Sequence, residues 1–154
     1  MVSGLVGDAF VGDIDNTGKQ EWLSLAQKQQ ESIRGSDVGR RKAHVRSTKN
    51  LAATTKYSLE SSQSAINKIA KKNGAIVTTK TLALGKSAKT DNALKVAEQT
   101  NQFDKVFQEI LKKELNDYQT ELKKLYESST GKTTKTGLST AYTNAGLLAT
   151  EANR

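Results

Sequence analysis

No proline occurs among the 154 residues of this chain. Proline breaks helix interiors, because it lacks a backbone N–H and its ring clashes with the preceding turn. Its absence, beside abundant Ala, Lys, Gln, Glu and Leu, favours long uninterrupted helices. The sequence therefore predicts an all-α fold.

The apolar content limits how large a core the chain can build. Hydrophobic residues make up 35% of the sequence and mean hydropathy is −0.62, whereas globular proteins have about 45–50% apolar residues when glycine is counted. Alanine supplies many of the apolar positions and buries little area. We therefore expect extended helices with a thin core that partner subunits complete. The expected helices cover about 19–34, 37–72, 75–100 and 101–127.

Two boundaries between these helices rest on glycine. Gly35-Ser-Asp37 is expected to end the first helix and cap the second, and Asn73-Gly74 to end the second. Residues 75–84 are rich in β-branched side chains, which leaves a short strand open as an alternative. A helix with a kink at Gly85 is preferred, because helical patterns flank this segment.

The two ends of the chain differ from the helical body at 19–127. Residues 1–18 mix apolar residues with glycine and aspartate and lack the basic region of a secretory signal. We interpret them as a docking segment that ends in a turn and a helix cap near Asn16. Residues 128–154 are rich in Ser, Thr, Gly and Lys at their start, which indicates a flexible or partner-docked tail.

Apolar residues recur with the spacing of helices that pack on other helices. Between Leu111 and Leu125 the spacing alternates between four and three residues, as in a heptad repeat. Between Val38 and Ile66 an apolar residue recurs every seven positions, with mostly small polar companions. We predict that these stripes bind partners. The predicted interface is Trp22, Val38, Val45, Leu59, Ile66, Phe103, Phe107, Leu111, Leu115, Tyr118, Leu122 and Leu125.

Positive charge is concentrated in residues 35–90, which carry twelve Lys and Arg against two acidic residues. Such a segment can lie against phosphates or an acidic protein face. The candidate contacts are Arg40, Arg41, Lys42, Arg46 and Lys49. Tyr57 is the one aromatic residue in the segment, which is too few for base stacking. Non-specific contact with DNA or an acidic partner, and an ordinary solvated face, both remain open.

Residue counts argue against an enzyme. The chain has one histidine and no cysteine, so any metal site or nucleophile–histidine pair would depend on His44 alone. The sequences Gly85-Lys-Ser and Gly131-Lys-Thr resemble the end of a phosphate-binding loop, but the glycine expected five residues earlier is absent in both. We therefore expect no catalytic residues, no metal and no cofactor.

The order of motifs resembles a known family. Gly39-Arg-Arg-Lys42 opens a long helical stretch, Val106-Phe-Gln-Glu-Ile-Leu111 follows a glycine-containing middle, and Leu125-Tyr-Glu127 precedes a Lys/Thr/Gly/Ala tail. Over about residues 36–135 this pattern resembles the smallest internal virion (ejection) protein of short-tailed, podovirus-type bacteriophages.

The resemblance implies a non-enzymatic protein that assembles as a ring of identical copies inside the capsid at the portal vertex. Its expected partners are the larger core proteins and the portal, with non-specific contact to DNA. After ejection with the genome, such proteins contact the host cell envelope and help to form a conduit across it. Two alternatives remain, a phage head-to-tail adaptor or neck protein and a small basic DNA-binding architectural protein.

Overall fold

The computed structural model describes the backbone of residues 7–154 and the side chains from Gly18 onward. All regular secondary structure in this range is helical, which confirms the predicted all-α fold. The helices are α1 (Gly7–Lys42), α2 (Arg46–Lys72), α3 (Thr79–Ala83), α4 (Ala88–Gln99), α5 (Phe103–Ser128) and α6 (Lys132–Ala152).

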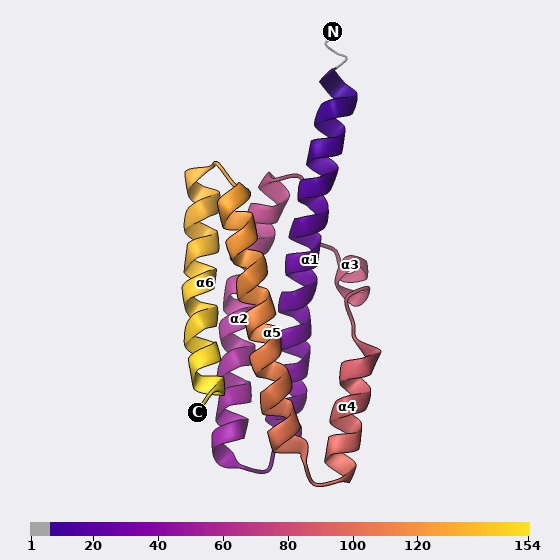
Figure 1. Ribbon diagram of the computed structural model, residues 1–154, viewed down its shortest axis with the longest axis vertical. Helices are drawn as coiled ribbons and strands as arrows, with labels where there is room; N and C mark the ends of the chain where they lie inside the picture. The colour runs from indigo at the N-terminus through magenta and orange to yellow at the C-terminus, as the bar shows by residue number, and fades with distance from the viewer. Residues whose placement is uncertain (1–6) are drawn as a thin grey trace.

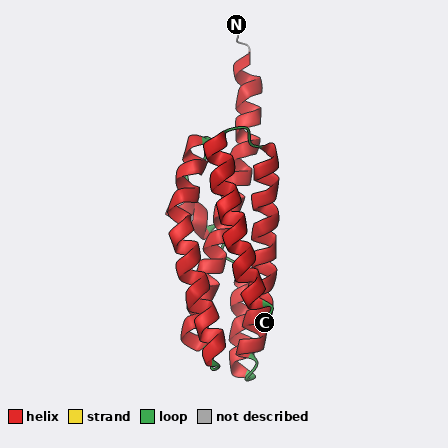
Figure 2. Ribbon diagram, turned by 90° about the vertical axis from the view of Figure 1, so that its left-hand side faces the viewer, coloured by secondary structure: helices red, strands yellow, loops and turns green. Residues whose placement is uncertain are grey.

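The four long helices α1, α2, α5 and α6 form an antiparallel bundle (Figure 1). Around the bundle, α1 packs on α2 and α5, and α6 packs on α5 and α2. The short helices α3 and α4 lie outside this bundle against α1 and α5, and they return the chain from one end to the other (Figure 1, Figure 2). Because of this return, α2 and α5 run in the same direction at diagonal corners.

Helix α1 is longer than the helices around it. Its N-terminal turns continue past the ends of α2, α5 and α6 (Figure 1, Figure 2). The predicted turn at residues 13–18 is wrong, because these residues are helical. Residues 1–6 of the predicted docking segment lie outside the described residues.

The predicted break at Gly35-Ser-Asp37 is also wrong, since α1 continues to Lys42. Ser36 is buried, and a side chain at Gly39 would overlap the ring of Phe107. These small residues therefore serve close helix packing rather than a break. The main buried stripe of α1 alternates at three- and four-residue intervals, with Ala26 and Ile33 buried beside it: Trp22, Leu25, Gln29, Ser32, Ser36 and Gly39.

Helix α2 contains only part of the predicted seven-residue stripe. Leu59 and Ile66 are buried on it, whereas Val38 belongs to α1 and Val45 precedes the first turn of α2. The predicted end at Asn73-Gly74 is confirmed. Gly74 has a positive φ of 87°, a conformation that glycine adopts without steric cost.

The single helix predicted for residues 75–100 is replaced by two. Residues 75–78 have no regular structure, and no strand forms in the described part of the chain. The hydroxyls of Thr78 and Ser87 accept hydrogen bonds from the backbone N–H groups of Thr81 and Thr90, and so cap α3 and α4. These two caps divide the segment. By contrast, the predicted helix at 101–127 matches α5 closely.

Most of the predicted tail forms the helix α6, which packs on α5 and α2 of the same chain. Gly137 allows close packing against α2, because a side chain there would overlap Ile69. Leu138 is fully buried. The chain thus encloses a continuous core of its own, although a third of the buried apolar residues in the main cluster are alanines.

Candidate interaction surfaces

Most of the side chains predicted to bind partners lie inside the bundle. Val45 is 54% exposed and Val38 is half-buried. The other ten are not available to a partner in this conformation. Heptad spacing indicates that a helix packs on something, but it does not say whether the neighbour belongs to the same chain. The ten buried side chains are Trp22, Leu59, Ile66, Phe103, Phe107, Leu111, Leu115, Tyr118, Leu122 and Leu125.

The core also contains a network of hydrogen-bonded polar side chains that the sequence pattern does not indicate. The amide of Gln29 is fully buried and donates hydrogen bonds to the hydroxyls of Tyr118, at 2.9 Å, and Ser62, at 3.1 Å. Burial raises the pKa of the Tyr118 hydroxyl above its usual value, so the phenol stays protonated. This network ties α1, α2 and α5 together.

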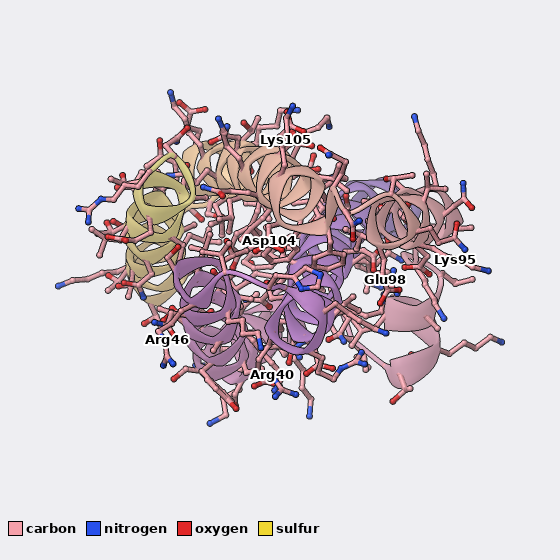
Figure 3. All side chains as sticks on the ribbon, turned by 90° about the horizontal axis from the view of Figure 1, so that it is seen from below. Arg40, Arg46, Lys95, Glu98, Asp104 and Lys105 are labelled. Atoms are coloured by element: carbon pink, nitrogen blue, oxygen red, sulfur yellow. The ribbon has the colours of Figure 1, made fainter. Side chains whose placement is uncertain are left out.

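The predicted basic contact lies at one end of the bundle, where α1 ends and α2 begins (Figure 3). Arg40 and Arg41 both pair with Asp37, at 2.9 and 3.3 Å, and Lys42 pairs with Glu98 at 2.9 Å. Two carboxylates therefore offset part of the charge of these three cations.

The remaining two predicted contacts differ from them. Arg46 and Lys49 are exposed and form no ion pair within the described residues. Figure 3 shows Arg40 and Arg46 on the same side of this end, while Lys95 and Lys105 lie on other sides. Only part of the predicted cationic group is thus free to meet an anion.

Asp104 holds the turn between α1 and α2 in place. Its carboxylate accepts hydrogen bonds from the backbone N–H groups of His44, at 2.9 Å, and Val45, at 2.8 Å. Partial burial alone would raise the pKa of Asp104, but these two hydrogen bonds outweigh it and keep the pKa below its usual value. His44, the one histidine of the chain, thus lies in an exposed turn that a hydrogen bond from its backbone N–H holds in place.

A groove of about 500 Å³ between α1, α4 and α5 is lined by charged side chains of both signs. Glu31 accepts a hydrogen bond from the backbone N–H of Ser87, at 2.7 Å, and pairs with Arg34 at 2.7 Å. Arg34 also pairs with Asp91 at 2.7 Å. These contacts attach the first turn of α4 to α1, which gives the cluster a structural use.

Glu114 on α5 faces the same groove. Burial, reinforced by the nearby charge of Glu31, raises the pKa of its carboxyl to about 7. Glu114 is therefore partly protonated near neutral pH. Among the side chains that the structure describes, no group of three histidine or acidic residues converges to hold a metal ion.

A second groove runs between α2 and α6 and has a volume of about 900 Å³. Its lining contains no charged side chain, in a sequence in which 26% of residues are charged. Small residues dominate it, so the two helices leave an open groove between them. The lining consists of Thr54, Tyr57, Ser58, Ser61, Ser62, Ala65, Ile66, Gly137, Thr140, Ala141 and Asn144.

None of the described helices combines the length and the hydropathy that a bilayer-crossing segment needs. Comparison of the chain with protein-family models, with curated proteins and with solved structures finds no match. The interpretation of the surfaces therefore rests on their own chemistry and on the pattern of the sequence.

Proposed function

We propose that this chain is a non-enzymatic structural protein that acts in several copies within a larger assembly. The observation that carries this proposal is the N-terminal part of α1, which continues past the bundle without a neighbouring helix among the described residues (Figure 1, Figure 2). Helices in proteins draw most of their stability from tertiary packing, which no other described helix supplies to this part of α1. A helix built in this way favours a function in which another molecule packs against it.

The sequence of this extension supports the same reading. Phe10 and Ile14 lie four residues apart, which puts them on one helix face, and Val11 lies beside them. Val11 also precedes Leu25 by fourteen residues, nearly four turns, so this face continues the one that α1 buries in the bundle. The apolar spacing of the α1 sequence thus continues beyond the bundle.

The sequence resemblance suggests which assembly this is. We propose that the chain belongs to the internal core of a short-tailed bacteriophage, where a ring of copies contacts the larger core proteins and the portal. On ejection with the genome it would contact the host envelope and help to form the conduit. A head-to-tail adaptor is the alternative assembly, and it too would use a helical bundle with an extended contact helix.

A test of this proposal is quantitative mass spectrometry of purified virions of a phage that encodes the chain. The expected result is several copies per particle that are lost when DNA ejection is triggered, while the portal protein stays with the empty particle. Retention of the chain after ejection would favour the adaptor. Absence from the particle would contradict both assemblies.

One observation favours DNA contact as a second candidate function. Arg46 and Lys49 are exposed, lie one turn apart and have no ion-pair partner in the described part of the chain. If they bind phosphates, affinity for duplex DNA should fall steeply with salt, and each neutralised phosphate contributes about 0.9 to the slope of log affinity against log salt. Replacing both residues with alanine should lower that slope by about two. No binding at about 50 mM salt would remove this candidate.

A further inference from the structure

We propose that the N-terminal extension of α1, residues 7–17, docks in the α2–α6 groove of a second copy of this chain. The inference rests on the proposed function, because it names the contact by which copies associate. It joins two features: the part of α1 that no other described helix accompanies, whose sequence contains Phe10, Val11 and Ile14, and the uncharged groove between α2 and α6.

The sizes of the two surfaces agree. Eleven helical residues, 7–17, span about 16 Å at 1.5 Å per residue. On α2 the groove lining extends from Thr54 to Ile66, which is about 20 Å by the same measure. The groove is thus long enough to hold the whole extension.

The side chains of the two surfaces also complement each other. The groove is lined mainly by Ser, Thr, Ala and Gly, whose short side chains let a second helix approach closely. The extension supplies the large apolar residues that such a channel lacks, Phe10, Val11 and Ile14. Residues 136–150 of α6 contain no charged residue, so the apolar face of an incoming helix would meet no unpaired charge there.

Charge gives the contact a direction. Residues 1–18 contain Asp8, Asp13 and Asp15 and no lysine or arginine, whereas the rest of the chain has an excess of positive charge. Lys68 and Lys72 follow groove residues of α2 by seven positions and so share their helix face near one end of the groove. Both lysines are exposed and lack an ion-pair partner within the described residues. Aspartates of the extension would find their counter-ions there.

A second copy is the occupant that the geometry favours. The extension continues the axis of α1 and points away from its own bundle, so it does not reach the groove of the same chain as long as α1 stays straight (Figure 1, Figure 2). A contact between an end of one copy and the side of the next is heterologous. Heterologous contacts close into rings when the rotation permits and otherwise form filaments.

Cysteine cross-linking tests the proposed contact directly, because the natural sequence contains no cysteine. Full-length Val11→Cys protein is mixed with differently tagged Ser61→Cys protein, whose substitution lies in the groove, and treated with a short thiol cross-linker. The expected product is a mixed dimer. Asn116→Cys, on an exposed part of α5 outside the groove, replaces Ser61→Cys in the control mixture and should give none.

Sedimentation equilibrium then compares two matched tryptophan substitutions. Asn144→Trp obstructs the groove at one end and should raise the dissociation constant of the oligomer about tenfold or more, since the extension cannot lie along the groove without meeting the new ring. Asn116→Trp is equally exposed but lies outside the groove, and it should change the constant less than about twofold. The double variant Phe10→Asp/Ile14→Asp should weaken association as Asn144→Trp does, and combining the two changes should add little.

The outcomes separate this inference from the proposed function. Oligomers that form equally well with Asn144→Trp and with Phe10→Asp/Ile14→Asp would overturn the docking contact and leave a multi-copy protein with a different interface. A mixed dimer with Asn116→Cys as abundant as that with Ser61→Cys would also overturn it. A protein that stays monomeric at every concentration and is missing from virions would contradict both proposals.

Discussion

Two helix contacts in this bundle follow the same heptad spacing with different side chains. Along α5 the buried stripe is large and apolar, for example Phe107 and Leu115. Where α1 crosses α2, the buried positions include Ser32, Ser36 and Thr55. Spacing alone therefore sets which faces meet, whereas side-chain size decides whether a contact adds apolar burial or brings two backbones close together.

The α1–α2 contact also carries an energetic penalty that α5 avoids. The hydroxyls of Ser32, Ser36 and Thr55 are buried and make no hydrogen bond within the described residues. Each buried and unsatisfied polar group costs about 1–3 kcal/mol. We infer that the α5 stripe supplies most of the stability of the bundle, and that the α1–α2 contact mainly fixes how closely the helices pack.

Truncation of the α5 stripe should have the largest effect on stability. Leu115 is fully buried, so Leu115→Ala leaves a cavity in the core and should lower the free energy of unfolding by about 2–5 kcal/mol. Urea unfolding followed by circular dichroism measures this. A loss below about 1 kcal/mol would contradict the leading role of the α5 stripe.

The next effect concerns the α1–α5 contact at Glu114. Because its folded pKa, about 7, lies above its unfolded value of 4.5, the carboxyl stabilises the fold fully below about pH 4.5 and less as pH rises through 7. Glu114→Gln removes this loss, so the variant should gain about 2–3 kcal/mol relative to the natural chain between pH 4.5 and pH 8. Thermal unfolding at both pH values checks it. Parallel pH dependence in the two proteins would show that Glu114 does not titrate in this range.

A smaller loss of stability is expected at Gly39, where α1 packs on α5. A methyl group at Gly39 would overlap the Phe107 ring, so Gly39→Ala should destabilise the fold by about 1–3 kcal/mol. Gly18 provides the matched control, because it lies in the same helix and a Cβ there would touch nothing within 4 Å. Gly18→Ala should stabilise by up to about 1 kcal/mol through helix propensity. Equal effects of the two substitutions on stability would show that α1 and α5 do not pack closely at Gly39.

The smallest effect should have the opposite sign to that of Leu115→Ala. Ser32→Ala removes a buried hydroxyl that lacks a hydrogen bond, and should leave the free energy of unfolding unchanged or raise it by up to about 1 kcal/mol. Urea unfolding resolves the sign. A loss above about 1 kcal/mol would show that the hydroxyl has a partner, such as a buried water.

The sequence predicted α5 best because its large apolar residues repeat without interruption from Leu111 to Leu125. It misplaced the break in α1, because Gly35 and Ser36 have the composition of a turn and only tertiary packing reveals that Ser36 is buried in a helix contact. The sequence likewise does not distinguish the helix cap Ser87 from the many other serines and threonines. Local sequence patterns thus predicted the helices, whereas the helix boundaries depend on contacts between residues that are distant in sequence.

The interaction surfaces were less predictable for a related reason. Periodicity marked Leu115 and Phe107 as packing residues, but it did not distinguish a partner from another helix of the same chain. The ion pair between Lys42 and Glu98 joins residues far apart in sequence, so the partial neutralisation of the basic end was not visible either. The absence of charged residues from 136–150 can be read from the sequence, but only the structure shows that this part of α6 lines a groove with α2.

The most direct test of the account is the thermal unfolding of the variant Phe10→Asp/Ile14→Asp, followed by circular dichroism at a concentration where sedimentation shows a monomer. The bundle encloses its own core, and we propose that the extension serves association. We therefore expect that the monomer keeps the helicity of the bundle and unfolds in one cooperative transition. A monomer that loses most of its helicity, or melts without a cooperative transition, would show that partners complete the core and would contradict the account.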